Sequence, residues 1–238
     1  MKEITRGKSK IILDPQDGTN ELILQFTGDQ TVNEKGEIDP GANFVLANVT
    51  DEEKRRIAES VIGMSTFFFQ ALERGGIPTH FISADPANLQ MRVKAGKPLG
   101  QGVELIQRYY AYGSLLKRFE GYFRKWQPID LREFHHKNDE AGDPPMSLDI
   151  ILAARILTTD EYYAVRRLLG DASAVIRDEL AKKDLTLIDI KLEVFIVEDE
   201  DGLCFVVGDE IAGGSMRVAS ADKTEIKDKG ELARLILG

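Results

Sequence analysis

Short apolar runs separated by turn residues dominate the first half of the chain. The runs at 9–13 and 21–26 have β-strand character and flank the sequence DPQDG at 14–18, which is a strong turn signal. Further runs of the same kind lie at 90–93 and 103–110, and the segment 77–81 leads into another strand. The stretch 94–102, rich in Gly, Pro and Lys, interrupts the series and is the best candidate for a boundary between two lobes.

Apolar residues at helical spacing predict three helices. Thr50 with Glu53, and Thr158 with Glu161, each have the form of a capping box, in which two side chains satisfy free backbone N–H groups at a helix start. The predicted helices cover 51–73, 159–183 and 229–237. Because strands and helices follow one another without a regular β-α-β rhythm, the pattern favours the α+β class.

An acidic turn near the C-terminus joins two apolar runs that predict adjacent strands. The runs cover 187–194 and 206–208. Asp189, Lys191 and Glu193 recur at every second residue, so their side chains share one face of the first strand. Asp209 follows the second strand and brings another carboxylate to the same edge. Two converging carboxylates suit a hard divalent cation such as Mg²⁺. From this pattern alone, a solvated hairpin face with an acidic turn is an equally good interpretation.

Two segments in the first half have the parts of an anion site. In RGKSK at 6–10, Lys8 and Lys10 share one face of a strand beside a glycine, although a basic strand at the surface is the commoner case. Its glycine spacing is not that of a Walker A loop. Arg108 ends an apolar strand, and Ser114 opens a short helix after a Gly-Ser turn. This second segment combines a guanidinium, a hydroxyl and free backbone N–H groups.

Two later segments carry further candidate residues. In the polar sequence FHHKNDEAGDPP at 134–145, Lys137 and Asp143 would suit the carboxylate and the amine of an amino acid. On composition alone a solvated loop is the better interpretation, and the paired histidines are predicted to be loop residues. A Gly-Gly-Ser sequence shortly before Arg217 indicates another phosphate contact.

Composition narrows the classes of function. The net charge of −9 over 238 residues argues against a general nucleic-acid binder, whereas a small anionic metabolite needs only a local basic pocket. The single cysteine, Cys204, excludes an internal disulfide and fits a reducing compartment. The N-terminus is charged from Lys2 onward, and no apolar run is long enough to span a bilayer. These features predict a cytoplasmic protein that does not act on membranes or nucleic acids.

Taken together in chain order, these segments resemble the SAICAR synthetase family of ATP-dependent ligases of purine biosynthesis. The matching motifs span nearly the whole chain: RGKSK at 6–10, GIPT at 76–79, ELIQR at 104–108 with GSL at 113–115, KND at 137–139 with DP at 143–144, DIKLE at 189–193 and GDE at 208–210. The resemblance implies a two-lobed α+β fold. An ATP-binding cleft would lie between a small β-rich N-terminal lobe at 1–98 and a larger α+β lobe at 99–238.

The resemblance also implies a reaction. ATP phosphorylates the carboxylate of 5-amino-1-(5-phosphoribosyl)imidazole-4-carboxylate, and the amine of L-aspartate then attacks the acyl phosphate. The products are an amide, ADP and phosphate. Mg²⁺ and lysine side chains would offset the charge of the transferring phosphoryl group. The substrates would all be small molecules, and the protein would form a homodimer.

Residue roles follow from the resemblance, motif by motif. The cofactor residues would be Lys8, Lys10 and Glu104 for ATP, with Glu193 and Asp209 for Mg²⁺. The acceptor residues would be Arg108, Ser114 and Arg217 for the 5′-phosphate, with Asp29 on the loop that touches the imidazole nucleotide. The catalytic residues would be Lys191, Lys137 and Asp143, the last two on the aspartate side.

Four places depart from the family pattern, among them Gly142, where a histidine is common, and SMR at 215–217, which replaces Gly-Ser-Arg. The family's Asp-Thr-Ser-Ala-Gly-Asp-Gly loop is DQTVNEK at 29–35, of which only Asp29 clearly matches, and its Arg-Asn-Arg-Ala-Ala-Gly-Ser is RYYAYGS at 108–114. The ATP and metal residues therefore match better than the acceptor residues. This pattern leaves two alternatives, a ligase or small-molecule kinase of the same fold with another acid and amine, and a nucleotide-binding paralogue without catalysis.

Overall fold

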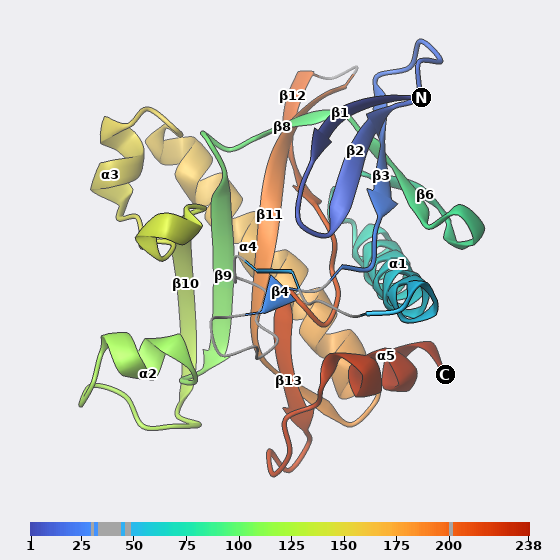
Figure 1. Ribbon diagram of the computed structural model, residues 1–238. Helices are drawn as coiled ribbons and strands as arrows, with labels where there is room; N and C mark the ends of the chain where they lie inside the picture. The colour runs from blue at the N-terminus through green and yellow to red at the C-terminus, as the bar shows by residue number, and fades with distance from the viewer. Residues whose placement is uncertain (30, 33–43, 46–48, 200–201) are drawn as a thin grey trace.

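The computed structural model describes residues 1–29, 31–32, 44–45, 49–199 and 202–238. Its N-terminal part is an antiparallel five-stranded sheet, seen at the upper right of Figure 1. In spatial order its strands are β1 (Lys2–Arg6), β2 (Lys10–Asp14), β3 (Glu21–Phe26), β7 (Gln90–Lys94) and β6 (Phe81–Asp85). The predicted turn at 14–18 joins β2 to β3, so this part of the prediction is confirmed.

A larger antiparallel sheet is built around the long strand β11 (Leu185–Asp199). The order across this sheet is β10 (Pro128–His136), β9 (Val103–Tyr110), β11 and β12 (Gly202–Gly208), and β11 also pairs with β13 (Met216–Ser220) and β8 (Gly96–Pro98). The predicted C-terminal hairpin is confirmed as the β11–β12 pair. A separate two-stranded pair joins β4 (Thr31–Val32) to β5 (Phe44–Val45).

Three longer helices match the predicted segments. They are α1 (Asp51–Arg74), α4 (Thr159–Ala181) and α5 (Lys229–Leu237). Both predicted capping boxes are present, at the starts of α1 and α4. The remaining helices are short: α2 (Ser114–Arg118), α3 (Leu148–Ala153), and the 3₁₀ turns η1 (Pro86–Asn88) and η2 (Asp139–Ala141). Helix α4 covers one face of the larger sheet, and α1 packs against both α4 and α5 (Figure 1).

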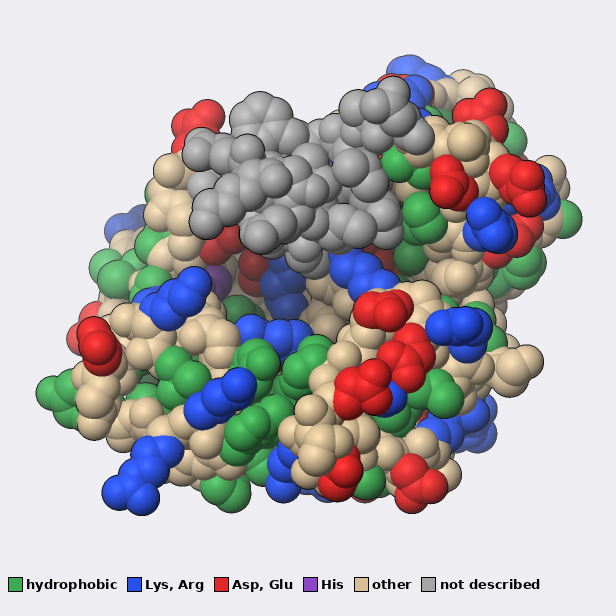
Figure 2. Space-filling view, turned by 60° about the horizontal axis from the view of Figure 1, so that its bottom comes forward, with side chains coloured by type: hydrophobic (Ala, Val, Ile, Leu, Met, Phe, Trp, Pro, Cys, Tyr) green, Lys and Arg blue, Asp and Glu red, His purple; other side chains and the backbone are tan. Residues whose placement is uncertain are grey.

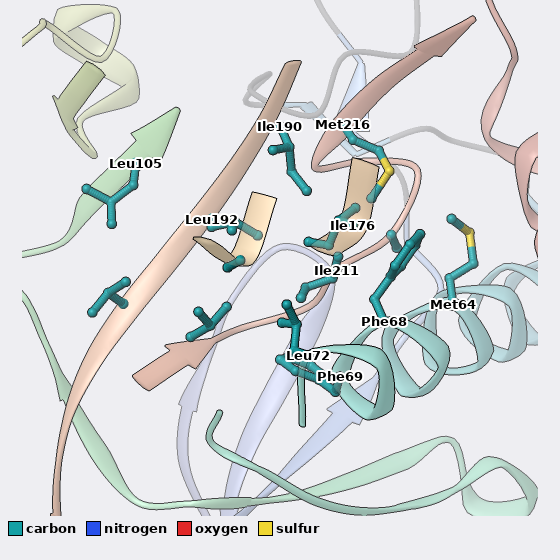
Figure 3. Close-up of a cluster of buried hydrophobic side chains, with 14 of the residues drawn as sticks. Met64, Phe68, Phe69, Leu72, Leu105, Ile176, Ile190, Leu192, Ile211 and Met216 are labelled. Carbon is teal, nitrogen blue, oxygen red and sulfur yellow. The ribbon is translucent and has the colours of Figure 1, made fainter. Parts of the chain in front are cut away.

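Alternate residues of β11 divide between the core and the opposite face of the sheet. Ile190 and Leu192 are buried in one apolar cluster with Phe68 of α1 and Ile176 of α4 (Figure 3). The charged residues between them line the pockets described below. Period-two alternation in one strand thus places the hydrophobic core directly behind the polar pockets.

The predicted α+β class and two-lobed arrangement are confirmed. Residues of the N-terminal sheet, such as Met91, belong to the same buried cluster as the core of the larger sheet. Strand β8 lies within the predicted N-terminal lobe but pairs with β11, where Pro98 stands opposite Phe195. The proposed lobe boundary between 98 and 99 therefore stays a prediction.

Two local predictions are wrong. His135 and His136 are not loop residues, because they form the end of β10, which pairs with β9 along the edge of the larger sheet. The polar composition typical of a half-exposed edge strand concealed this strand in the sequence. Lys8 does not share the strand with Lys10, since it lies in the bend before β2.

Candidate active site

A pocket of about 420 Å³ collects the residues predicted to bind ATP and metal. Its lining includes Lys8, Lys10, Glu104, Glu193 and Asp209. The same pocket is lined by other predicted site residues, namely Asp29, Lys137, Asp143 and Lys191. Segments from both ends of the chain therefore meet in one pocket, and we call it the acidic pocket.

Three carboxylates and two lysines lie together in the acidic pocket. Asp209 comes directly after β12, with a left-handed φ of 62°, and the preceding Gly208 stands opposite Glu193 of β11. Lys10 donates hydrogen bonds to both Asp209 and Glu210. Lys137 Nζ lies 2.5 Å from Glu193 Oε1. Each carboxylate in this group thus has a lysine partner.

Burial and charge act in opposite directions on these groups. Burial and the nearby charge of Asp209 raise the pKa of Glu193 to about 7. Burial also opposes ionisation of Asp209, but the charges of Lys10 and Lys137 outweigh it and lower the pKa of Asp209. Repulsion between two buried carboxylates is a condition that a bound divalent cation relieves.

The donor set fits Mg²⁺ bound together with phosphates. Among the residues that the structure describes, no three His, Cys, Asp or Glu side chains form a group able to enclose a metal ion. Glu193 and Asp209 therefore supply only part of a coordination shell. Mg²⁺ in phosphate sites commonly takes one or two carboxylates and completes its shell with phosphate oxygens and water.

A second pocket, of about 710 Å³, contains the predicted phosphate residues Arg108, Ser114 and Arg217. Arg217 Nε donates to Asp189 Oδ1 at 2.8 Å, and its Nη2 lies 2.5 Å from Asp189 Oδ2. The glycine-containing segment 213–215 and the start of α5 also line this pocket. We call this site the arginine pocket.

Arg108 occupies an unexpected place in the arginine pocket. Its side chain is only 2% exposed and its guanidinium donates to Glu133 and, at 3.0 Å, to Asp189 Oδ2. The side chain of Arg217 is 35% exposed. Arg217 and Ser114 are therefore the more accessible of the three predicted phosphate residues, and Arg108 lies behind them as the cation that holds two carboxylates.

Lys191 lies at the junction of the two pockets and lines both. Its Nζ donates to Oε1 of Glu104, on the neighbouring strand β9, at 2.7 Å. Ser215, whose carbonyl accepts the Lys191 backbone N–H at 2.7 Å, also lines both pockets. Charged side chains of both signs gather in the hollow seen in Figure 2. Gly214 and Lys229 line both pockets as well, so the two pockets share a wall that contains two lysines.

The remaining predicted residues lie at the rim of the acidic pocket. Asp29 pairs with Lys54 of α1, with 2.7 Å between Oδ1 and Nζ. Asp143 has a left-handed φ of 48°, and its Oδ1 accepts the backbone N–H of Asn138 at 2.8 Å. The structure therefore places Asp29 with the ATP and metal residues, and not in the arginine pocket. Of the rest of the 29–35 segment, residue 30 and residues 33–35 lie outside the described residues.

Sequence reasoning missed two carboxylates that organise the arginine pocket. Asp189 belongs to the alternating pattern and to the DIKLE motif, but neither indicates that it binds both Arg108 and Arg217. Glu133 gave no signal, because its contact with Arg108 depends on the pairing of β9 with the unpredicted strand β10. Knowing that strand pair would have placed Glu133 near the pocket.

Comparison with known proteins decides the family. A family model described as SAICAR synthetase matches residues 3–234. The chain belongs to the SAICAR synthetase family. The expectation of an ATP-dependent ligase of purine biosynthesis is thereby confirmed at the level of the family.

Relatives and solved structures agree with this assignment. A phosphoribosylaminoimidazole-succinocarboxamide synthase of Clostridium tetani is 36% identical over 218 residues, which cover 91% of this chain and 92% of that protein. The crystal structure of the synthase of the same name from Ehrlichia chaffeensis superposes with a TM-score of 0.80 at 25% identity, covering 100% of this chain and 92% of that one. A SAICAR synthetase in complex with ADP gives a TM-score of 0.76 at 26% identity, covering 96% and 88% of the two chains.

None of the helices in the described part of the chain combines the length and the apolar composition that a membrane span requires.

Proposed function

We propose that this chain is a phosphoribosylaminoimidazole-succinocarboxamide synthase that uses ATP to join L-aspartate to the carboxylate of 5-amino-1-(5-phosphoribosyl)imidazole-4-carboxylate. The observation that carries this proposal is the shared wall at Lys191, between a pocket with paired carboxylates and a pocket with arginines. A kinase-like step between two bound substrates needs this arrangement, because the phosphoryl donor and the acceptor must lie in line.

ATP binds in the acidic pocket. Lys8 and Lys10 contact its phosphates, while Glu104 keeps Lys191 in position through their 2.7 Å ion pair. Glu193 and Asp209 hold Mg²⁺, which when bound neutralises phosphate charge and orients the terminal phosphoryl group. Lys10 donates to Asp209 and Glu210, so its ammonium lies beside one of the carboxylates that would hold the metal.

The acceptor nucleotide binds in the arginine pocket. Ser114 and the exposed side of Arg217 bind its 5′-phosphate, and Arg108 fixes them from behind. A carboxylate oxygen of the imidazole attacks the γ-phosphorus of ATP, the bond from that phosphorus to the bridging oxygen breaks, and ADP leaves. The ammonium of Lys191 stabilises the negative charge that spreads over the transferring group.

The aspartate side lies at Lys137 and Asp143, which line the acidic pocket. Lys137 attracts a carboxylate of L-aspartate, and the Asp143 carboxylate accepts the proton that the amine loses on attack. The amine nitrogen bonds to the acyl carbon, phosphate leaves with its oxygen, and the amide forms. The departure from the family pattern at 108–114 includes Arg108 and Ser114 of the arginine pocket, so it bears on the choice of acid.

Assembly and location form part of the same proposal. We expect a homodimer in the cytoplasm, with small molecules as the only substrates. The single cysteine of the chain suits a reducing compartment, and the family acts in purine biosynthesis, whose substrates are small molecules. The N-terminal lobe would end at 98 and the larger lobe would begin at 99.

A coupled assay for ADP release tests the proposal directly. The full chain is incubated with MgATP, L-aspartate and the imidazole carboxylate nucleotide, and the amide product is identified by mass spectrometry. ADP and amide in equal amounts, dependent on both co-substrates, are the expected result. ADP release with a different acid, and none with this pair, would select the alternative ligase or kinase. Failure to bind ATP by calorimetry would overturn both.

A further inference from the structure

Arg217 is held on three sides in the arginine pocket. Asp189 binds its guanidinium through both carboxylate oxygens. The Tyr112 ring lies under the guanidinium, with 5.5 Å between the Arg217 Cζ and the ring centroid. Gly113 lies so close that a Cβ added there would stand 1.7 Å from Arg217 Nη1, and its φ is 57°. A guanidinium held by a carboxylate, an aromatic face and a bare backbone has one orientation.

The Tyr112 ring is itself held by residues outside the pocket lining. Trp126 packs against it, with 5.1 Å between ring centroids, and Trp126 also contacts Tyr110 at 6.2 Å. Lys125 Nζ lies 5.2 Å from the Tyr112 centroid. Two cations, from Arg217 and Lys125, therefore lie within cation–π distance of the same ring.

Trp126 adopts a backbone conformation that bulky residues rarely take. Its φ is 68°, which is costly for a large side chain and persists only where the surroundings enforce it. Two backbone hydrogen bonds do so here: Trp126 N–H donates to the Ala111 carbonyl at 3.0 Å, and Ala111 N–H donates to the Gln127 carbonyl at 2.9 Å. The strained residue is thus tied to the segment that leads into Gly113.

These contacts form a line from a strained loop residue to the pocket. Trp126 supports Tyr112, Tyr112 supports Arg217, and Arg217 faces the pocket where the acceptor phosphate is proposed to bind. Neither Tyr112 nor Trp126 lines the pocket itself. The Arg217 side chain is 35% exposed, so its contacts with Asp189 alone would allow other side-chain conformations. The Tyr112 ring restricts these conformations.

We infer that Tyr112 is a positioning residue for the proposed ligase reaction: its ring, supported by Trp126, fixes the Arg217 guanidinium for binding of the acceptor's phosphate. This inference rests on the proposed function for the identity of the acceptor. It also makes Trp126, the only tryptophan in the chain, a fluorescent reporter of anion binding in the arginine pocket.

Kinetics of Tyr112→Ala and Tyr112→Phe test the inference. Loss of the ring is expected to raise the KM for the phosphorylated acceptor about 5- to 20-fold, the range of a partly desolvated cation–π contact. The KM for ATP and the kcat should stay within about twofold, since Tyr112 touches neither ATP nor the acyl carbon. Tyr112→Phe keeps the ring and should restore the acceptor KM. Tyr122→Ala is the matched control, because Tyr122 lies in the same loop region and is 82% exposed.

A binding experiment separates this inference from the proposed function. Inorganic phosphate is titrated into the full chain while Trp126 emission is recorded, with calorimetry as a second measure, and no turnover is required. The emission of the wild type and of Tyr122→Ala should change with the same apparent Kd, and Tyr112→Ala should raise that Kd by the factor seen in KM.

The inference is overturned if Tyr112→Ala binds phosphate like the wild type. It is also overturned if the wild type binds no phosphate, or if Tyr112→Ala raises both KM values equally. Inactivity of the wild type toward the proposed acceptor, with the shift in phosphate affinity intact, would contradict only the proposed function.

Discussion

His135 Nδ1 lies 2.7 Å from the backbone carbonyl oxygen of Asp143. Because a carbonyl can only accept, Nδ1 carries a proton in this contact, and the other ring nitrogen, Nε2, lies 3.4 Å from Arg118 Nη1. The imidazole is buried at 4% exposure. A side chain on β10 thus fixes the left-handed turn that carries a proposed catalytic residue.

Replacing His135 with Phe should loosen this turn. The ring volume is kept, but the Asp143 carbonyl loses its donor, and an unsatisfied buried carbonyl costs about 1–3 kcal/mol. We expect kcat/KM for L-aspartate to fall about tenfold, with a smaller effect on the acceptor nucleotide. Steady-state kinetics with each substrate varied in turn would measure this. His136→Phe, one residue along the same strand, is the control. Equal losses for all three substrates would show that His135 supports only the fold.

Glu133 links pH to stability. Burial alone would raise its pKa, but hydrogen bonds from His135 and Arg108 and the charges of Arg108 and Arg118 lower the pKa to about 2. A depressed folded-state pKa contributes stability above the unfolded value of about 4.3 and loses it as pH falls toward the folded value. Glu133→Gln should therefore lower the free energy of unfolding by about 1–3 kcal/mol at neutral pH.

The pH dependence gives that prediction its check. Denaturant unfolding of the wild type and Glu133→Gln is compared between pH 7 and pH 2.5. The difference in free energy of unfolding between the two proteins should be constant down to about pH 4.5 and shrink below it. At low pH the Glu133 carboxylate of the wild type becomes protonated and loses its charge, as in the Gln variant. A difference that stayed constant to the lowest pH would assign it to packing and not to ionisation.

Arg108 and Arg217 should respond differently to the same substitution. Arg108→Met leaves the buried carboxylates Glu133 and Asp189 short of a partner, and loss of one side of a buried ion pair costs about 3 kcal/mol or more. Arg217→Met, at a side chain 35% exposed, should leave stability nearly intact and raise the KM for the phosphorylated acceptor. Thermal unfolding and kinetics on both variants measure the contrast. A stable Arg108→Met enzyme with a high acceptor KM would reverse these two roles.

Asp209→Asn should abolish turnover without unfolding the chain. Asn tolerates the left-handed conformation that Asp209 adopts at φ 62°, so the backbone can stay in place. The substitution removes one of the two proposed metal carboxylates, and we expect kcat to fall by about 10²-fold or more. Circular dichroism would verify the fold, and EDTA followed by added Mg²⁺ would test the metal in the wild type. Wild-type kcat in the variant would refute the metal role of Asp209.

The parts of this structure that depend on local patterns were predictable. The capping boxes at Thr50 and Thr158 fixed the starts of both long helices, and alternation at 189–193 put three charged side chains on one face of a strand. The strands β1, β4, β5, β8, β10 and β13 and the short helix α3 were not predicted. Their sequences are short or polar, and pairing with a distant neighbour determines their structure.

The arginine pocket shows most clearly what a sequence conceals. Gly113 and Arg217 are far apart in the chain, yet no side chain at 113 could coexist with the observed guanidinium. The left-handed Trp126 likewise follows from backbone bonds to Ala111, which no local pattern encodes. Residue types suggested which groups bind phosphate, whereas the contacts that orient those groups arise only from the tertiary fold.

Strand β11 carries proposed active-site residues on one face and core residues on the other, and it pairs with β9, β12, β13 and β8. A slip of one residue in its register would turn Ile190 and Leu192 toward the pockets and bury three charges in the core. Such a misaligned molecule would lose both pockets at once and much of its stability. The hydrophobic core and both pockets therefore depend on the same strand register.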